Sequence, residues 1–376
     1  MVGHSLRPTG SGGGFETSEE GTPAEPAVFW RGERRFASRL NGAAGVLTNR
    51  FTMPVRGSNT VSASFLEPAG ASVEEQGFRT SLLSNQFFFV EPDPDELTGV
   101  QKAWLKDYLN RLEAALYGPS FTDPKRGYRA FIDSASFIDH HIIVEATKNV
   151  DGFRFSTFYH KDRNGRVKMG PLWDWNLSFG DANGKEGWLA ENWLWPQLDD
   201  QQYTWFRRLF DDPDFAQAYV DRWAELRKSV LATPRVRVRI DQFAGELDEA
   251  QQRNFERWPI LGHAVAPNWF VGSSYDEEVQ WMAEWIEARL TWMDRQFVAA
   301  PEAVVNKNGS KRIVELRSEL SKAKIYYTGD GSDPRAPGGK PAVRARLYES
   351  AISLGEKGHL FARVEHRNRW SSPVRY

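Results

Sequence analysis

KNVDGFRFSTFYHKDRNGRVKMGPLWDWNLSFG, residues 148–180, is the stretch of this chain that decides its fold. The β-forming side chains at 153–159 predict one strand, and residues 167–173 predict a second. Residues 162–165 carry the Asn-Gly pair that is typical of a hairpin turn. The hairpin would bring Asp151, which precedes its first strand, close to Asp174, which follows its second.

Two carboxylates at the open end of one hairpin have the chemistry to hold a divalent metal and orient a nucleophile. Kinase-type phosphoryl transfer uses one Asp to accept the proton of the substrate hydroxyl, and a second Asp and an Asn to hold Mg²⁺. Asn176 follows Asp174 by two residues. The sequence therefore predicts Asp151 as the base, with Asp174 and Asn176 as metal ligands.

Each of these residues also has a simpler interpretation. Asp151 could form a turn before Gly152, and Asp174 could be a hydrogen-bond acceptor between two Trp residues. Asn149 either orders the loop or contacts a nucleotide phosphate. Lys148 is a candidate phosphate contact, although a Lys at a helix end also interacts favourably with the helix dipole.

The pattern NxDGFxxST at 149–157, followed by GPxWDWNLSFG at 170–180, resembles the CotH kinase family, the atypical protein kinases of the spore-coat CotH type. The resemblance extends over about residues 87–297 and includes FFVEP at 88–92, GYRAFIDSASFID at 127–139 and RNFERWP at 253–259. It implies a kinase-like fold that uses ATP and Mg²⁺ to phosphorylate a Ser or Thr hydroxyl of a protein substrate.

By position in this pattern, Asp151 matches the catalytic-loop Asp of the family and Asp174 its metal-binding Asp. Many relatives carry a second Asp where this chain has Asn176, so one metal ligand here is uncharged. A glycosidase that uses Asp151 and Asp174 as its carboxylate pair is an alternative, prompted by the 15 Trp residues. It would require carboxyl groups about 5 to 9.5 Å apart beside a sugar-sized cleft.

The composition of the chain excludes several classes of protein. The net charge is −2 over 376 residues, so no basic field indicates a nucleic-acid partner. No apolar run is long enough to predict a membrane span. The absence of Cys excludes disulfides, Cys-zinc sites and thiol catalysis. The first residues lack the apolar core of a signal peptide, so the location stays undetermined, with the cell envelope or exterior expected if the start is truncated.

The N-terminal quarter has no clear kinase pattern. Residues 1–27 are rich in Gly, Ser, Thr, Pro and Glu and are interpreted as a disordered tail. Residues 28–85 suggest only short strands near 45–54 and 60–65. They are interpreted as a truncated or degraded small lobe. No Lys occurs before Lys102, whereas a kinase small lobe normally supplies one to hold the phosphates. Activity is therefore expected to be weak or lost, and a catalytically inactive binding module is the alternative.

The fold class predicted is α+β: a mainly helical kinase-like large lobe with a β-hairpin site at 86–300, and a C-terminal β-sandwich at 301–376. In the lobe, the apolar periodicity predicts a strand at 87–90 and helices at 95–117, 133–148, 215–230, 236–258 and 276–297.

The last 75 residues change to short strands about ten residues apart, which is the spacing of a small β-sandwich. The segment IYYTGDGSDPR at 325–335 resembles the C-terminal domain of chitobiase, a fibronectin-III-like module. It implies an accessory domain with a possible contact to polysaccharide or the cell surface. Few contacts are expected across the boundary near Pro301. The core is predicted from Ile313, Ile325, Tyr327, Leu347, Ile352, Leu360 and Val364.

Overall fold

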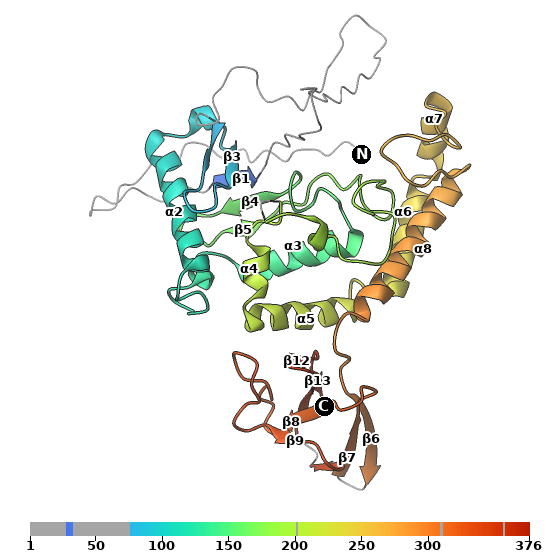
Figure 1. Ribbon diagram of the computed structural model, residues 1–376. Helices are drawn as coiled ribbons and strands as arrows, with labels where there is room; N and C mark the ends of the chain where they lie inside the picture. The colour runs from blue at the N-terminus through green and yellow to red at the C-terminus, as the bar shows by residue number, and fades with distance from the viewer. Residues whose placement is uncertain (1–27, 33–75, 201, 309–310, 356–357) are drawn as a thin grey trace, which may run out of the picture.

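The computed structural model describes residues 28–32 and 76–376, apart from 201, 309–310 and 356–357 (Figure 1). The tail at 1–27 and the strands expected near 45–54 and 60–65 lie outside the described residues. The first described element is the strand β1 (Val28–Gly32), which the sequence did not single out.

A five-stranded antiparallel sheet has the order β2-β3-β1-β4-β5. Besides β1 it contains β2 (Gly77–Arg79), β3 (Gln86–Glu91), β4 (Phe158–Lys161) and β5 (Lys168–Met169). The β1 strand pairs with β3 on one side and with β4 on the other. The expected strand at 87–90 is confirmed, and the sheet continues into the hairpin that carries the candidate site.

Helix α2 (Gly99–Tyr117) begins four residues later than predicted. Thr98 Oγ1 accepts a hydrogen bond from the backbone N of Gln101, and the side-chain oxygen of Gln101 accepts one from Thr98 N, which is a capping box. Residues Pro94–Glu96 form a separate 3-10 turn. The predicted apolar face is confirmed, since Leu105 and Leu109 are fully buried.

Helix α3 (Ser134–Thr147) lies beneath the sheet at the centre of the large lobe (Figure 1). Asp133 caps its start by accepting a hydrogen bond from Ser136 N. Its end is set by Lys148, whose φ of 49° is in the left-handed region that stops a helix. Since nine of its 14 residues are buried, α3 is a well-packed support that ends shortly before Asp151.

Five further helices complete the large lobe. They are α4 (Phe206–Phe210), α5 (Pro213–Arg227), α6 (Thr233–Glu246), α7 (Asp248–Arg257) and α8 (Tyr275–Asp294). Figure 1 shows α2 on one side of α3, α6 and α8 on the other, and α5 facing the C-terminal strands. None of the helices that the structure describes has the length and apolar character to cross a membrane.

Other helices also differ from their predicted bounds, and the helix expected at 276–297 ends at Asp294. The helix expected at 215–230 ends at Arg227, and Val230 is 63% exposed. The helix expected at 236–258 is two helices that meet at Leu247. Periodicity does not locate such a break because both segments keep helical side-chain spacing.

The C-terminal part consists of two antiparallel sheets. One has the order β10-β7-β6, from β6 (Glu302–Asn308), β7 (Lys311–Arg317) and β10 (Ile352–Leu354). The other has the order β12-β11-β8-β9, with β13 on β11, from β8 (Lys324–Thr328), β9 (Arg346–Leu347), β11 (Phe361–His366), β12 (Arg369–Trp370) and β13 (Val374–Arg375). The mixed α+β fold class is thereby confirmed.

The core of these sheets agrees only in part with the prediction. Ile325, Leu360 and Val364 are buried. Leu347 was wrongly included, because it is 47% exposed. On β7 the fully buried side chain is Val314 and not Ile313, a shift of one residue that exchanges the two faces of a strand.

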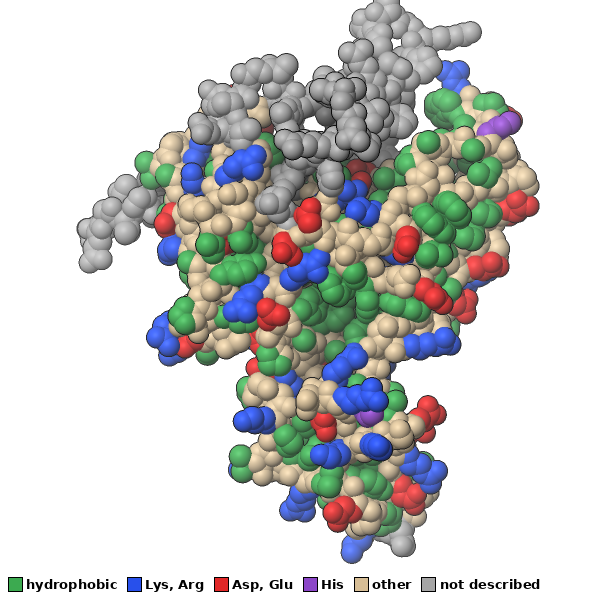
Figure 2. All heavy atoms as spheres, in the orientation of Figure 1, with side chains coloured by type: hydrophobic (Ala, Val, Ile, Leu, Met, Phe, Trp, Pro, Cys, Tyr) green, Lys and Arg blue, Asp and Glu red, His purple; other side chains and the backbone are tan. Residues whose placement is uncertain are grey.

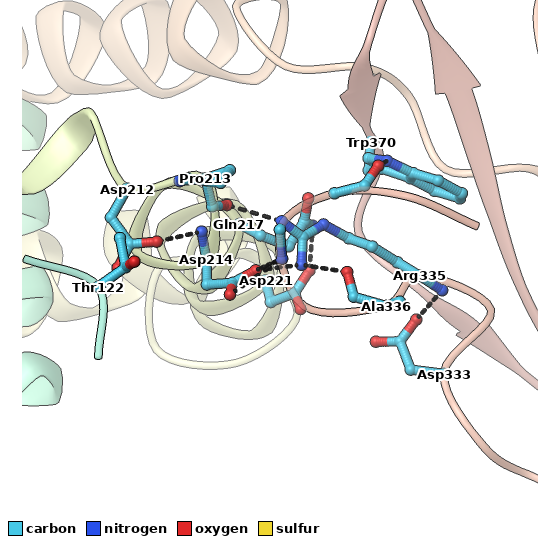
Figure 3. A network of polar contacts seen from close by, with 12 residues as sticks. Thr122, Asp212, Pro213, Asp214, Gln217, Asp221, Asp333, Arg335, Ala336 and Trp370 are labelled. Atoms are coloured by element: carbon cyan, nitrogen blue, oxygen red, sulfur yellow. Dashed lines mark hydrogen bonds and ion pairs between the residues drawn. The ribbon is translucent and has the colours of Figure 1, made fainter. Parts of the chain in front are cut away.

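The expectation of few contacts between the two parts is wrong. Arg363 on β11 pairs with Asp221 on α5 at 2.7 Å and with Asp333 at 2.6 Å, and its side chain is 2% exposed. Arg335 pairs with Asp214 on α5 at 2.7 Å. Figure 3 shows this network, in which acidic side chains of α5 face the C-terminal loops. The C-terminal part is therefore attached through ion pairs whose Arg side chains are buried, and not by its linker alone.

Replacing Asp214 by Ala should weaken this attachment. Asp214 accepts hydrogen bonds from Arg335 Nη1 at 2.7 Å and from Gly338 N at 2.9 Å. Loss of a partner for a mostly buried guanidinium should lower the free energy of unfolding by about 1–3 kcal/mol, measured by urea denaturation. Arg344→Ala removes an exposed pair with Asp330 and should change stability little. Equal effects of the two changes would contradict the assignment.

Candidate active site

The hairpin at the candidate site is confirmed but is shorter than predicted. β4 and β5 pair Tyr159 with Met169 and His160 with Lys168. Gly165 N donates to Asp162 O at 3.0 Å, which closes the turn. Residues 153–157 are not a strand, because the Asp151 carbonyl accepts amide hydrogen bonds from residues 154–156 and forms a compact turn.

Asn149 connects the two halves of the candidate site. Its amide nitrogen donates to Asp174 O at 3.1 Å, and its amide oxygen accepts from Asp151 N at 3.1 Å. The side chain is fully buried. One amide group therefore holds the backbones of Asp151 and Asp174 on its two sides, which is the juxtaposition that the hairpin argument predicted.

Two further backbone hydrogen bonds align these segments. Val150 N donates to Leu177 O at 3.2 Å, and Phe179 N donates to Thr147 O at 2.8 Å. Trp175 Nε1 donates to Thr147 Oγ1 at 2.9 Å. The loop that carries Asp174 and Asn176 is thus fixed along the end of α3.

Asp151 is held by a neighbouring Arg. Arg154 Nη2 contacts Asp151 Oδ1 at 2.9 Å, and Arg154 Nε donates to Val150 O at 3.3 Å. The Asp151 side chain is 24% exposed. This pairing restricts the rotamers of the carboxylate while leaving it accessible to solvent.

Asp174 and Asn176 are both exposed on the loop after β5. Asp174 has φ of 61°, a left-handed conformation that Asp tolerates better than most residues. Within the described part of the chain neither side chain has a hydrogen-bond or ion-pair partner. Their oxygen atoms are the hard ligands that Mg²⁺ prefers.

These oxygens would not enclose a metal by themselves. No group of three or more His, Asp or Glu residues in the described ranges could hold a metal ion. Protein Mg²⁺ sites usually supply one or two carboxylates, with phosphates of the substrate and water completing the octahedron. Asp174 and Asn176 fit that kind of site.

The Lys148 side chain is buried and hydrogen-bonded within the protein, whereas a contact with a nucleotide phosphate requires an accessible ammonium group. Its Nζ donates to Leu189 O at 2.9 Å and to Glu191 O at 2.8 Å, and the residue is fully buried. Burial and the nearby Arg289 lower the pKa of Lys148 to about 8. The hydrogen bonds of this ammonium group are thus donated to carbonyls of the Trp-rich loop, residues 187–196.

The turn after Asp151 is supported from α3. The Gly152 carbonyl accepts from His140 Nε2 at 2.9 Å and from Thr157 Oγ1 at 2.8 Å. His140 Nδ1 is buried and has no hydrogen-bond partner among the described residues. Burial lowers the pKa of His140 to about 4, so the neutral tautomer with the proton on Nε2 fits this position. His140 is thus a structural residue that supports the turn after Asp151.

This burial predicts acid sensitivity. The folded pKa of His140 is depressed from 6.5 to about 4, so the unfolded chain takes up the proton first and stability falls as the pH decreases from about 6.5 to 4. Linkage over this window corresponds to roughly 3 kcal/mol. His140→Gln should flatten this part of the stability curve, measured by urea denaturation at several pH values. His263→Gln, at an exposed position, should leave the curve unchanged; the same slope in both variants would contradict the prediction.

A buried ion pair that the sequence analysis missed holds the Trp-rich loop. Arg289 on α8 contacts Glu145 on α3 at 2.9 Å, with both side chains fully buried. Glu145 also accepts from Leu194 N and Trp195 N at 3.0 Å each. Arg289 Nη1 donates to the carbonyls of residues 190 and 192. A charged residue among the buried positions of α8, beside Ile286, Leu290 and Met293, was the signal that could have revealed it.

The end of the WDWNLSFG segment is fixed by close packing. Gly180 has φ of 88°, and an added Cβ would clash with the ring of Trp285 on α8. Trp285 Nε1 donates to Trp188 O at 2.8 Å, and Trp281 Nε1 donates to Gly180 O at 3.3 Å. Glycine is required here for both its conformation and its size.

Comparison with protein families agrees with this arrangement. The model described as "CotH kinase protein" matches residues 74–293, and the model described as "Fn3 associated" matches residues 314–375. No curated protein and no solved structure matches the chain. Because the first model covers more than half of the chain and includes every residue of the candidate site, the protein belongs to the CotH kinase family.

Proposed function

We propose that this protein is a kinase-like phosphotransferase that transfers the γ-phosphoryl group of ATP to a Ser or Thr hydroxyl of a protein, with Mg²⁺. Membership of the family supports kinase-like function at the family level. The observation that carries the proposal is the Asn149 amide, which hydrogen-bonds both to Asp151 N and to Asp174 O. A base and a metal-binding carboxylate on adjacent loops are what in-line phosphoryl transfer needs.

Asp151 is assigned the role of the base. One carboxylate oxygen is held by Arg154, which leaves the other to accept the proton of the acceptor hydroxyl. The hydroxyl oxygen then bonds to the γ-phosphorus as the bond to the β–γ bridging oxygen breaks, and ADP leaves. The support for this role is the combination of partial exposure and fixed orientation.

Asp174 and Asn176 are assigned as the metal ligands. They are exposed, they are two residues apart, and their oxygens are free of partners within the described residues. Mg²⁺ bound there would neutralise charge on the β- and γ-phosphates. Asn176 contributes an uncharged oxygen, so the site should bind the metal weakly in the absence of nucleotide.

Lys148 and Asn149 are assigned to loop positioning instead of nucleotide contact. Both hydrogen-bonding ends of the Asn149 amide are used inside the protein. The Lys148 ammonium donates to two loop carbonyls. Neither side chain is therefore available to a phosphate in this arrangement.

One observation favours a second candidate function, which is nucleotide binding without efficient transfer. No Lys precedes Lys102 in the sequence, and Lys148 is occupied by the loop. Phosphoryl transfer depends on positioning and charge stabilisation, so a site in which no Lys contacts the phosphates should lose orders of magnitude in rate. A contact of the C-terminal part with polysaccharide or the cell surface stays a prediction.

The test is ATP titration by calorimetry with and without Mg²⁺, followed by transfer of radiolabelled phosphate to a mixed pool of acceptor proteins. We expect weak binding that requires Mg²⁺ and little turnover. Efficient transfer would show that another residue holds the phosphates. Absence of any Mg²⁺-dependent binding would refute both candidate functions.

A further inference from the structure

A cavity of about 780 Å³ lies where the large lobe meets the C-terminal part. Its lining comes from the Trp-rich loop, α4, α5, the segment after α8, and loops of the C-terminal part. Aromatic side chains dominate it, among them Trp193, Trp195, Phe210, Tyr219, Phe297 and Trp370. This volume and an aromatic lining are typical of small-molecule sites, which occur preferentially between domains.

The floor of the cavity carries no charge at neutral pH. His141 Nδ1 lies 3.2 Å from Tyr219 Oη, and His141 Nε2 contacts Tyr203 Oη. Burial holds the pKa of His141 well below its usual value and the pKa values of both Tyr side chains well above theirs. A neutral floor with satisfied polar groups suits an apolar ligand body.

The side formed by the C-terminal part is cationic. Arg335, Lys340 and Arg369 line the cavity. The Arg335 side chain is 8% exposed, and its Nε is buried without a hydrogen-bond partner among the described residues. Lys340 and Arg369 are exposed and pair with no carboxylate in the described ranges.

Asp214 already opposes the charge of Arg335, so the unopposed cations among the described lining residues are Lys340 and Arg369. The acidic residue in the lining is Asp211, which already pairs with Arg208 at 3.1 Å. Figure 2 shows Lys and Arg side chains gathered on the visible face of the C-terminal part near the junction. The local field therefore favours an anion at this side of the cavity.

We propose that the cavity binds an amphipathic anion, with an apolar body against the aromatic floor and a carboxylate or phosphate head group beside Arg335, Lys340 and Arg369. Lys340 and Arg369, which are exposed and pair with no carboxylate in the described ranges, would contact the head group. Because the lining comes from both parts of the chain, such a ligand would also stabilise their attachment. This inference is independent of the proposed kinase activity, since none of the candidate site residues lines the cavity.

The test uses calorimetry of the full chain with four probes below their micellar concentrations. Dodecanoate and dodecyl phosphate present the apolar body with each anionic head, acetate lacks the body, and dodecyltrimethylammonium reverses the charge. We expect at least one of the anionic probes to bind and the other two to fail. A preference between dodecanoate and dodecyl phosphate would identify the head group.

Two pairs of variants locate the binding. Ala216→Trp on α5 should fill the cavity and weaken binding at least about tenfold, whereas Ala218→Trp, exposed on the same helix, should not. Lys340→Glu should weaken binding roughly threefold, and Lys311→Glu, exposed elsewhere in the same part, should not. The Lys340 pair keeps the test valid if Ala216→Trp does not fold.

Three results would overturn the proposal: no binding of either anionic probe, equal binding of dodecyltrimethylammonium, or unchanged affinity in both Ala216→Trp and Lys340→Glu. Ligand-dependent increases in the unfolding temperature of the full chain, lost in the same variants, would support it independently.

Discussion

Replacing Asp174 by Ala should remove the Mg²⁺ dependence of ATP binding by this chain. Asp174 supplies the charged oxygen ligand of the proposed metal site, and its carboxylate has no partner within the described residues. Without it, Asn176 alone offers one neutral oxygen, which is a poor ligand set for Mg²⁺. The affinity for ATP in the presence of Mg²⁺ should fall by more than about tenfold, to the value measured without metal.

Asp151→Ala is the informative comparison. It should leave ATP binding nearly intact and remove any measurable transfer, because a base acts on the acceptor hydroxyl and not on the nucleotide. Asp162→Ala, at the exposed turn of the same hairpin, controls for removal of a negative charge. If Asp162→Ala weakened Mg²⁺-dependent binding as much as Asp174→Ala, the metal site would not be where we propose it.

The proximity of Asp151 and Asp174 could be predicted from local sequence patterns. The Asn-Gly turn and the two short β-forming runs specify a hairpin. Because its two strands pair, the residues at its open end lie close together. The patterns did not specify what joins the ends. The sequence allowed two roles for Asn149, which are loop ordering and contact with a nucleotide phosphate. Its hydrogen bonds to residues 2 and 25 positions away favour loop ordering.

Other features depend on contacts between distant residues, which local patterns do not encode. The Lys148 ammonium reaches carbonyls more than 40 residues away. The Arg363–Asp221 pair joins residues 142 apart. A Lys at a helix end and an Arg in a strand look exposed in the sequence, and it is the loop or domain packed over them that makes them buried hydrogen-bond donors.

Replacing Arg289 by Met should be the most destabilising single change in the large lobe. It leaves Glu145 buried without its cation, and burial already raises the pKa of Glu145. Removing one partner of a buried pair typically costs about 3–5 kcal/mol. Urea denaturation followed by circular dichroism would measure the loss. Arg253→Met, which breaks an exposed pair with Glu249 on α7, should cost at most about 1 kcal/mol.

The double variant Glu145→Leu with Arg289→Met separates the cost of an unpaired charge from that of the loop contacts. Removing both charges should recover part of the loss, as neutral replacements of buried pairs often do. Recovery should be incomplete, because the amides of Leu194 and Trp195 and the carbonyls of residues 190 and 192 also lose their partners. Hydrogen exchange should then show faster exchange in the Trp-rich loop than in α3. Full recovery with unchanged exchange would mean that the ion pair does not hold the loop, and that Lys148 and the packing of Trp285 are sufficient to keep it in place.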